Sequence, residues 1–233
     1  MMVINCIGHS GFSVETETHM LIFDYWKGTL PRLPMKKKLY VFVSHSHEDH
    51  FNPDVFSLCR DHPNVRYVLS NDTPLADVRA RGIRECIVAE PGMDMHTESR
   101  FRIKALPSTD RGVAYLVCMN GRNLFHAGDL HLWLWRDMTE AQIYDMTLRF
   151  REYTRGLRGF SIDTAFLPLD TRLGIYAFLG IDYYMKNYRI GRVIPMHLNG
   201  PATAVDDLRF DPISRDYRDR IVKMEAGQHL AFN

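Results

Sequence analysis

The sequence is poor in cysteine and has no cysteine pair with metal-ligand spacing. Four cysteines are spread over 233 residues, and none belongs to a C-x-x-C pair. A disulfide framework or a cysteine-ligated structural zinc is therefore not expected. A domain of this length can bury enough surface to fold without either one. We interpret the cysteines as free thiols in a reducing, cytoplasmic compartment.

The sequence also lacks an excess of charge and a long apolar run. Its formal net charge is +1, from 29 basic and 28 acidic residues. Binding to nucleic acid through bulk electrostatics needs a positive excess or a basic patch with interleaved aromatic residues. No apolar run approaches the ~18–20 residues of a membrane span, and the first residues do not read as a signal peptide. We expect neither a nucleic-acid partner nor a membrane.

The order of the predicted elements indicates a single α/β domain over residues 1–233. Apolar runs bounded by glycine or polar turns predict strands at 3–7, 11–15, 20–25, 39–44, 65–70, 86–89, 100–106, 114–119 and 123–127. Helical spacing predicts helices at 53–61, 73–81, 139–157 and 175–188. Further strands are expected at 164–169, 192–196, 221–224 and 229–232. This order suggests two packed sheets with helices outside.

Histidine is the residue type that stands out, because three of the 11 histidines fall within six residues. His45, His47 and His50, with Asp49 among them, follow a buried apolar strand. Side chains two positions apart on an extended segment point the same way, so His45 and His47 can converge on one ion. After the chain turns, Asp49 and His50 can face a neighbouring point. The segment therefore indicates a site for Zn, Fe, Mn or Ni.

This segment resembles the H-x-H-x-D-H motif of the metallo-β-lactamase superfamily. Further matches follow in order along nearly the whole chain: Asp24 at the end of an early strand, Asp129 in Phe-His-Ala-Gly-Asp, and His197 after Ile-Pro-Met. The opening Gly-His-Ser-Gly-Phe, at residues 8–12, is similar to a subgroup that includes ascorbate-6-phosphate lactonase-like proteins. The resemblance implies a four-layer αββα sandwich and a metal-dependent hydrolase.

One expected histidine is absent. Such proteins usually carry a metal-binding histidine before the aspartate that bridges two metals, which Asp129 resembles here. Residues 106–113 read LPSTDRGV, in which Asp110 is the best substitute; otherwise Asp110 is a loop residue and the first site has fewer protein ligands. With Asp110, the resemblance implies a first site of His45, His47 and Asp110, and a second of Asp49, His50 and His197, bridged by Asp129. We expect one or two divalent transition-metal ions per chain. Zinc is the first choice, and the extra carboxylate shifts the preference toward Mn or Fe.

The implied chemistry is attack by a metal-bound hydroxide on an ester, lactone, amide or phosphoester centre. Asp49 and Asp129 are the expected catalytic groups, and Asp49 is the candidate for orienting the nucleophile or moving its proton. We interpret Asp24 and His126 as groups that support the ligands from behind. Arg172 is a candidate for binding an anionic substrate; the alternative is a salt bridge with Asp170.

Other residues around the motifs carry weaker signals. His9 and His131 are interpreted as supporting or structural residues rather than ligands. Trp133 and Trp135 alternate on one face and either wall a pocket or simply pack.

A hydrolase of a small-molecule ester, lactone or phosphoester is the leading functional hypothesis. A phosphodiesterase or nuclease is the first alternative, although the chain is short for an additional nucleic-acid-clamping domain. A metal-binding sensor without turnover is the second alternative, and the absent histidine favours it. The expected partner is a small-molecule substrate, and the sequence is compatible with a homo-oligomer. Fold resemblance does not decide between these functions.

Overall fold

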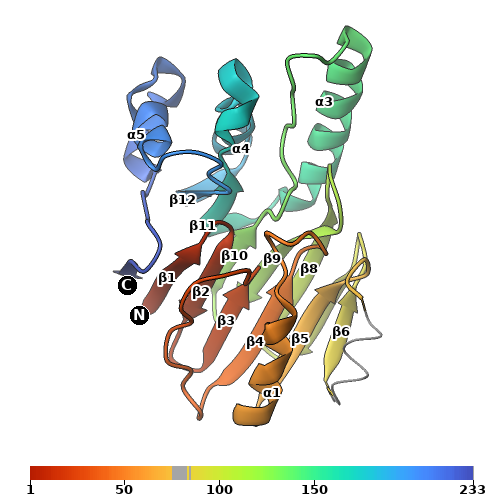
Figure 1. The fold of residues 1–233 in the computed structure, drawn as a ribbon, viewed down its shortest axis with the longest axis vertical. Coiled ribbons are helices and arrows are strands. Elements are labelled where there is room, and N and C mark those ends of the chain that lie inside the picture. Colours follow the sequence, from red (N-terminus) through yellow and green to blue (C-terminus); the bar gives the residue numbers. More distant parts are fainter. Residues whose placement is uncertain (75–82, 84, 233) are drawn as a thin grey trace. The chain divides into compact units, whose positions relative to one another are not determined.

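The computed structural model describes residues 1–74, 83 and 85–232 (Figure 1). The helix predicted at 73–81 lies almost entirely outside these residues. The chain divides into two compact units: unit 1 comprises Met1–Glu90 with Met224–Asn233, and unit 2 comprises Pro91–Lys223. Each unit is built on its own sheet, and the single domain over 1–233 stays a prediction. Within the described ranges, no helix is both long and apolar enough to cross a membrane.

The sheet of unit 1 has the strand order β13-β1-β2-β3-β4-β5-β6. Its strands are β1 (Met2–Gly8), β2 (Gly11–Glu15), β3 (His19–Phe23), β4 (Lys38–Val43), β5 (Val65–Ser70), β6 (Cys86–Ala89) and β13 (His229–Phe232). The pairs from β13 to β3 are antiparallel, and those from β3 to β6 are parallel. The carboxyl ends of β3, β4 and β5 therefore meet at one edge. Asp24, residues 44–51 and Asp72 follow these three ends.

A short helical segment covers one face of this sheet directly after the histidine motif. It consists of η1 (Pro53–Ser57) and α1 (Leu58–Asp61). Asn52 caps its start by accepting a hydrogen bond from the Asp54 N–H at 2.9 Å, and Pro53 occupies the first position. The segment packs on the sheet through an apolar cluster that includes Phe51, Val55, Phe56, Met20, Ile22, Val41, Val43, Tyr67 and Leu69. This packing holds the end of the motif against the sheet.

The sheet of unit 2 has the strand order β12-β11-β10-β9-β8-β7. Its strands are β7 (Asp94–Glu98), β8 (Phe101–Pro107), β9 (Val113–Met119), β10 (Arg122–His126), β11 (Ser161–Pro168) and β12 (Arg189–Met196). Strands β7 to β10 pair antiparallel, whereas β10, β11 and β12 are parallel. The carboxyl ends of the parallel strands again share an edge, and Asp129, Asp170 and His197 follow them.

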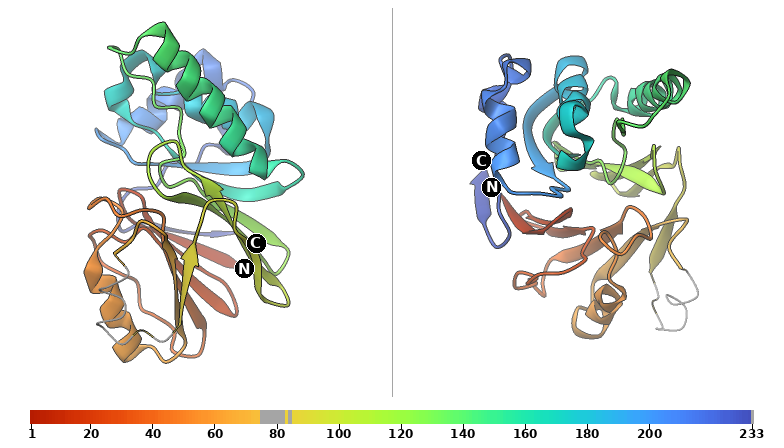
Figure 2. Two further views of the ribbon diagram at one scale, coloured as in Figure 1. Left: turned by 90° about the vertical axis from the view of Figure 1, so that its right-hand side faces the viewer. Right: turned by 45° about the horizontal axis from the view of Figure 1, so that its top comes forward.

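Three helices of unit 2, α3 (Glu140–Thr154), α4 (Leu179–Asn187) and α5 (Thr203–Phe210), lie over one face of its sheet (Figures 1 and 2). A capping box between Thr139 and Gln142 starts α3. Phe150 of α3 and Tyr184 of α4 are buried, with ring centroids 5.2 Å apart. Short 3-10 segments complete the unit: η2 (Arg155–Leu157), η3 (Thr171–Tyr176), η4 (Pro212–Ser214) and η5 (Arg218–Arg220).

Several sequence predictions agree with these elements and a few are wrong. Strands β2, β5, β6 and β13 have the predicted bounds. No strand forms at 221–224, where Ile221 makes only an isolated bridge to Val193. Strand β7 was not predicted because its polar sequence, DMHTE, forms a partly exposed edge strand. The eight residues of α5 were also not predicted.

Candidate metal centre

The loop at residues 44–51 brings the three motif histidines of unit 1 together. His45 and His50 are fully buried, and their ring centroids lie 4.1 Å apart. The ring of His47 lies 4.7 Å from that of His45. The His50 N–H donates to the His47 carbonyl at 3.0 Å, which closes the turn inside the motif. His45 and His47 each offer a ligand nitrogen within 4.8 Å of the other.

Asp24 is the buried carboxylate behind this loop. Its Oδ1 accepts the Ser44 N–H at 2.7 Å, and its Oδ2 accepts the Ser44 hydroxyl at 2.5 Å. The same Oδ2 lies 2.7 Å from Nδ1 of His50. An imidazole whose Nδ1 is engaged by a carboxylate presents Nε2 to a metal. The geometry is compatible with the orienting role expected of Asp24, which stays a prediction.

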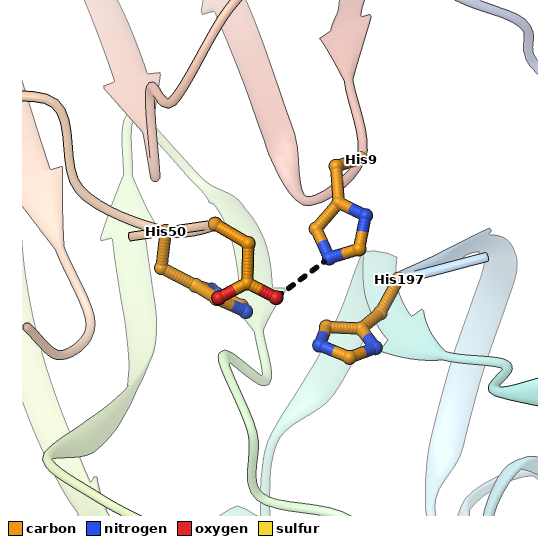
Figure 3. A group of neighbouring side chains, drawn as sticks. His9, His50 and His197 are labelled. Atoms are coloured by element: carbon orange, nitrogen blue, oxygen red, sulfur yellow. Dashed lines mark ion pairs between the residues drawn. The ribbon is translucent and has the colours of Figure 1, made fainter. Parts of the chain in front are cut away.

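His9 also lies in this group, although the sequence pointed to a supporting role. It occupies the turn between β1 and β2, and its Nε2 lies 3.2 Å from Oδ2 of Asp49 (Figure 3). His9, Asp49 and His50 each offer a ligand atom, and these atoms lie within 4.8 Å of one another. The Gly-His-Ser-Gly sequence draws attention to His9. Its proximity to Asp49 and His50, however, depends on the order of the strands in the sheet, which residue spacing does not reveal.

A second carboxylate, Asp72, holds the middle of the loop. Its Oδ2 accepts both the N–H and the hydroxyl of Ser46, each at 3.1 Å. Ser46 stands between His45 and His47, so this contact holds the backbone from which both histidines project. Asp72 follows β5, the neighbour of β4 in the sheet. Sequence reasoning missed it because nothing in the chain near Asp72 marks the contact.

In unit 2, Asp129 and His197 come together at the carboxyl ends of β10 and β12. Nε2 of His197 lies 3.6 Å from Oδ1 of Asp129, and both side chains are buried. The Asp129 carbonyl accepts a 2.9 Å hydrogen bond from the Trp133 indole and a 3.3 Å bond from the Thr109 hydroxyl. Asp110 is exposed and offers a carboxylate oxygen within 4.8 Å of one from Asp129. The position of Asp110 is compatible with the predicted role of a metal ligand.

Asp170 is the counterpart of Asp24 in unit 2, and sequence reasoning saw it only as a partner of Arg172. Its fully buried carboxylate lies 3.4 Å from Nδ1 of His197 and 2.5 Å from the Arg172 guanidinium. Burial raises the pKa of the Asp170 carboxyl, but hydrogen bonds from His197 and Arg172 outweigh burial and hold the pKa well below its usual range. Arg172 thus forms the alternative salt bridge, and a role in substrate binding stays a prediction.

Two further histidines of unit 2, His126 and His131, are buried and lie near Asp129 in the sequence. His126 is buried, and its Nδ1 accepts the Gly128 N–H at 3.2 Å. His131 is buried between Trp133 and Phe150, at ring separations of 5.0 and 6.5 Å. Burial, with a smaller contribution from His197, lowers the pKa of His131 to about 3. His131 is therefore neutral at physiological pH.

Backbone conformation marks the same positions. The positive-φ residues other than glycine, within the described chain, are His9, Asp24, Asn120 and His197, with φ of 53°, 42°, 49° and 58°. His9, Asp24 and His197 each come directly after a strand, namely β1, β3 and β12. Left-handed non-glycine residues are uncommon and gather at functional sites. The conformation turns each side chain at the point where the strand ends.

The donor set fits a transition metal. Imidazole nitrogens and carboxylate oxygens are the ligands that Zn²⁺ and its neighbours accept. In each unit a histidine has Nδ1 against a buried carboxylate, Asp24 for His50 and Asp170 for His197. This pairing fixes the ring and leaves Nε2 for coordination. Each unit thus contains its own histidine–carboxylate pair, His50 with Asp24 in unit 1 and His197 with Asp170 in unit 2.

Comparison with known proteins places the chain in a family. The fold and these ligand groups define the class of metal-binding hydrolases with two sheets and flanking helices. The family described as Beta-lactamase superfamily domain matches residues 3–143, which is more than half of the chain. The protein belongs to this family.

Two curated relatives and one solved structure are similar to the chain over 90% or more of its length. The chain is 24% identical to a UPF0173 metal-dependent hydrolase of Heliobacterium modesticaldum, over 100% of this chain and 98% of the relative. It is 25% identical to a protein of the same description from Nanoarchaeum equitans, over 90% of each chain. The solved structure of a novel metallo hydrolase from Ignicoccus hospitalis matches with a TM-score of 0.69 and 18% identity, over 100% of this chain and 99% of that one. The predicted metallo-β-lactamase-type fold and the predicted enzyme class, a metal-dependent hydrolase, are confirmed.

Proposed function

We propose that the protein hydrolyses a small anionic ester, lactone or phosphoester with the help of one or two divalent metal ions. The observation that carries the proposal is the pairing of His50 Nδ1 with Asp24 at 2.7 Å, in a fully buried position. A buried imidazole held in this way has its metal-binding nitrogen fixed in advance. Family membership adds support for hydrolysis.

The proposed ligand set follows the order of the family motif. His45, His47 and Asp110 would hold the first ion, and Asp49, His50 and His197 the second, with Asp129 shared between them. When bound, such ions lower the pKa of water from 15.7 to about 7 and make a nucleophile available at neutral pH. Zinc is the first choice, and the carboxylate at Asp110 favours manganese or iron more than a histidine would.

The chain's own residues would orient the reaction. Asp49 is partly exposed, so an attacking water can reach its carboxylate, and its Oδ1 would accept a proton from that water. Asp24 and Asp170 would keep the rings of His50 and His197 from rotating. Asp129 is held by the Trp133 indole through its carbonyl, and its carboxylate lies 3.6 Å from Nε2 of His197.

An anionic substrate is favoured by the surroundings of His197. The Trp133 ring lies 5.5 Å from His197, and Trp135 stacks on Trp133 at 6.3 Å with an interplanar angle of 7°. The guanidinium of Arg172 lies 5.7 Å from the Trp135 ring, and its side chain is half exposed. An exposed guanidinium beside aromatic rings can take a phosphate or carboxylate while an apolar group contacts the rings. Lactones and phosphoesters that carry both an anionic group and an apolar group are the first substrates to test.

The test combines metal analysis with a substrate screen. Purified protein should contain about one to two transition-metal ions per chain. A panel of lactones, carboxylic esters, phosphomonoesters and phosphodiesters, assayed with Zn²⁺, Mn²⁺ and Fe²⁺, should reveal metal-dependent turnover. His47→Ala should remove metal and turnover together, whereas His96→Ala, at an exposed position of β7, should change neither. Protein that takes up no metal, or turnover that survives chelation, would refute the proposal.

A further inference from the structure

We propose that His9 is a metal ligand, so that His9, Asp49 and His50 form a three-residue binding group inside unit 1. The inference rests on the proposed metal-dependent function and adds a ligand to it. All three side chains project from one end of the same sheet, from the β1–β2 turn and from the loop after β4. One ligand atom from each lies within 4.8 Å of the other two.

The distances around these side chains separate two kinds of contact. A charge-assisted hydrogen bond between nitrogen and oxygen spans about 2.7–2.9 Å. Two atoms that bind one tetrahedral Zn²⁺ at about 2.0–2.1 Å lie about 3.3–3.5 Å apart, because they form an edge of the tetrahedron. The Asp24–His50 contact, at 2.7 Å, belongs to the first kind. The His9–Asp49 contact, at 3.2 Å, is at the upper end of the hydrogen-bond range and close to the second.

The backbone holds His9 in this place. Gly11 packs so closely that a Cβ atom there would lie 3.0 Å from the Gly8 carbonyl oxygen and 3.2 Å from that of Asp24. The turn that carries His9 therefore lies directly against the residue that orients His50. His9 itself has a φ of 53°, a conformation that side-chain-bearing residues seldom adopt. A sparsely populated conformation is retained where the surrounding structure requires it.

The His9 ring is also shielded in the way that a ligand needs. Its side chain is 10% exposed, and it lies edge-on to Trp26 at 5.5 Å and to His50 at 5.9 Å. The Trp26 carbonyl accepts a 2.7 Å hydrogen bond from the Asn52 amide, so the aromatic neighbour is tied to the end of the histidine loop. These contacts fix the plane of the ring and limit its rotation away from Asp49. Asp24 and Asp49 also bring negative charge that a cation would balance.

The experiment compares metal binding by the full chain and its variants. Metal-free protein is titrated with Co²⁺ and with Zn²⁺, and the visible spectrum of the Co²⁺ form is recorded. His9→Asn tolerates a positive φ and removes the imidazole, and His9→Gly removes both the ring and the conformational restriction. Both variants should lose at least tenfold in affinity for one ion and change the Co²⁺ spectrum. His62→Ala is the matched control, because His62 is a buried histidine of unit 1 that contacts Pro34.

The outcomes distinguish this inference from the proposed function. Wild-type stoichiometry, affinity and spectrum in both His9 variants would overturn the ligand role of His9 and leave the proposed function standing. An equal loss in His62→Ala would also overturn it, because the loss would then follow from a damaged fold. A wild-type chain that takes up neither Co²⁺ nor Zn²⁺ would overturn the proposed function, and the role of His9 with it.

Discussion

The two units orient a histidine with the same kind of group but surround that group differently. In unit 1, Asp24 lies 2.7 Å from His50 and otherwise accepts hydrogen bonds from the neutral donors of Ser44. In unit 2, Asp170 lies 3.4 Å from His197 and pairs with the Arg172 guanidinium. Oδ2 of Asp170 also accepts from the Asn199 amide at 3.1 Å. The contact with histidine is longer where a cation competes for the same oxygen.

Because of this difference, we expect Asp24 and Asp170 to have different roles. Asp24 is surrounded by the loop that carries the ligands, so it supports both that loop and the ring of His50. Asp170 balances the charge of a half-exposed arginine and caps the start of η3 through the Arg172 N–H at 2.9 Å. A change at Asp24 should therefore affect folding and metal binding together. A change at Asp170 should affect metal binding more selectively.

Removal of Asp24 should have the largest effect. Asp24→Ala leaves the buried donors of Ser44 and the ring of His50 without their acceptor, which should lower the free energy of unfolding by about 3–5 kcal/mol. Chemical denaturation of metal-free protein measures this loss. Asp163→Ala is the control, since Asp163 accepts from Arg122 and the Asn123 N–H but contacts no ligand. A loss at Asp24 no larger than at Asp163 would contradict the prediction.

Neutralisation of Asp170 should be milder for folding. Asp170→Asn retains an oxygen that can cap the Arg172 N–H but removes the charge between His197 and Arg172. We expect a loss of about 2–3 kcal/mol in the free energy of unfolding and a 10–100-fold loss in metal affinity, as for other groups that orient a ligand. Isothermal titration with Zn²⁺ tests the second part. Unchanged affinity would show that Asp170 serves the arginine alone.

The neutral His131 gives unit 2 a pH dependence that can be measured. Its pKa in the folded protein is lowered to about 3 from an ordinary value of about 6.5. The unfolded chain therefore takes up a proton first as the pH falls, and stability present above pH 6.5 is lost between pH 6.5 and 3. At pH 5 this loss is about 2 kcal/mol. Chemical denaturation at pH 7 and at pH 5 measures this loss. His131→Leu should abolish the loss, whereas His96→Leu should leave it unchanged.

Substitution of Arg172 should have the smallest effect on stability. The Arg172 side chain is 53% exposed, so its ion pair with Asp170 is screened, and Arg172→Gln should lower the free energy of unfolding by less than about 1 kcal/mol. The folded pKa of Asp170 lies below its unfolded value, so its carboxylate stabilises the fold above about pH 4 and that stability is lost in stronger acid. Without Arg172 the folded pKa rises, and acid unfolding should begin at a higher pH. An unchanged acid midpoint would contradict this assignment.

The histidine loop could be predicted from the sequence because its information is local. His45, His47, Asp49 and His50 lie within six residues after an apolar strand, and the spacing alone suggests convergence. The contacts of Asp72 and Asp170 could not be predicted in the same way. Each depends on which strands are neighbours, β5 beside β4 and β11 beside β12, and that order is a property of the whole sheet. The contact between His9 and Asp49 also joins segments about 40 residues apart in the chain.

The elements of the fold show the same limit. Strand β5 was predicted with the right bounds because Val65, Tyr67, Val68 and Leu69 give an apolar signal and its last four residues are buried. The edge strand β7, with the sequence DMHTE, has only exposed or partly buried side chains and gives almost no such signal. At 221–224 an apolar pattern suggested a strand, but the chain there pairs with β12 at a single position, Ile221 with Val193. Hydrophobic pattern reports burial and does not by itself report pairing.

The pairing of β1 with β13 has a consequence for the order in which the protein is made. The Gln228 carbonyl accepts the Cys6 N–H at 3.0 Å, and the Cys6 carbonyl accepts the Gly227 N–H at 2.8 Å. During translation, β1, which leads into His9, therefore emerges from the ribosome long before its partner β13 is synthesised. Strand β1 then has one edge without its native neighbour until residues 227–232 have been synthesised. Unit 1 therefore reaches its full sheet after unit 2 has been synthesised, although nine-tenths of its residues come first.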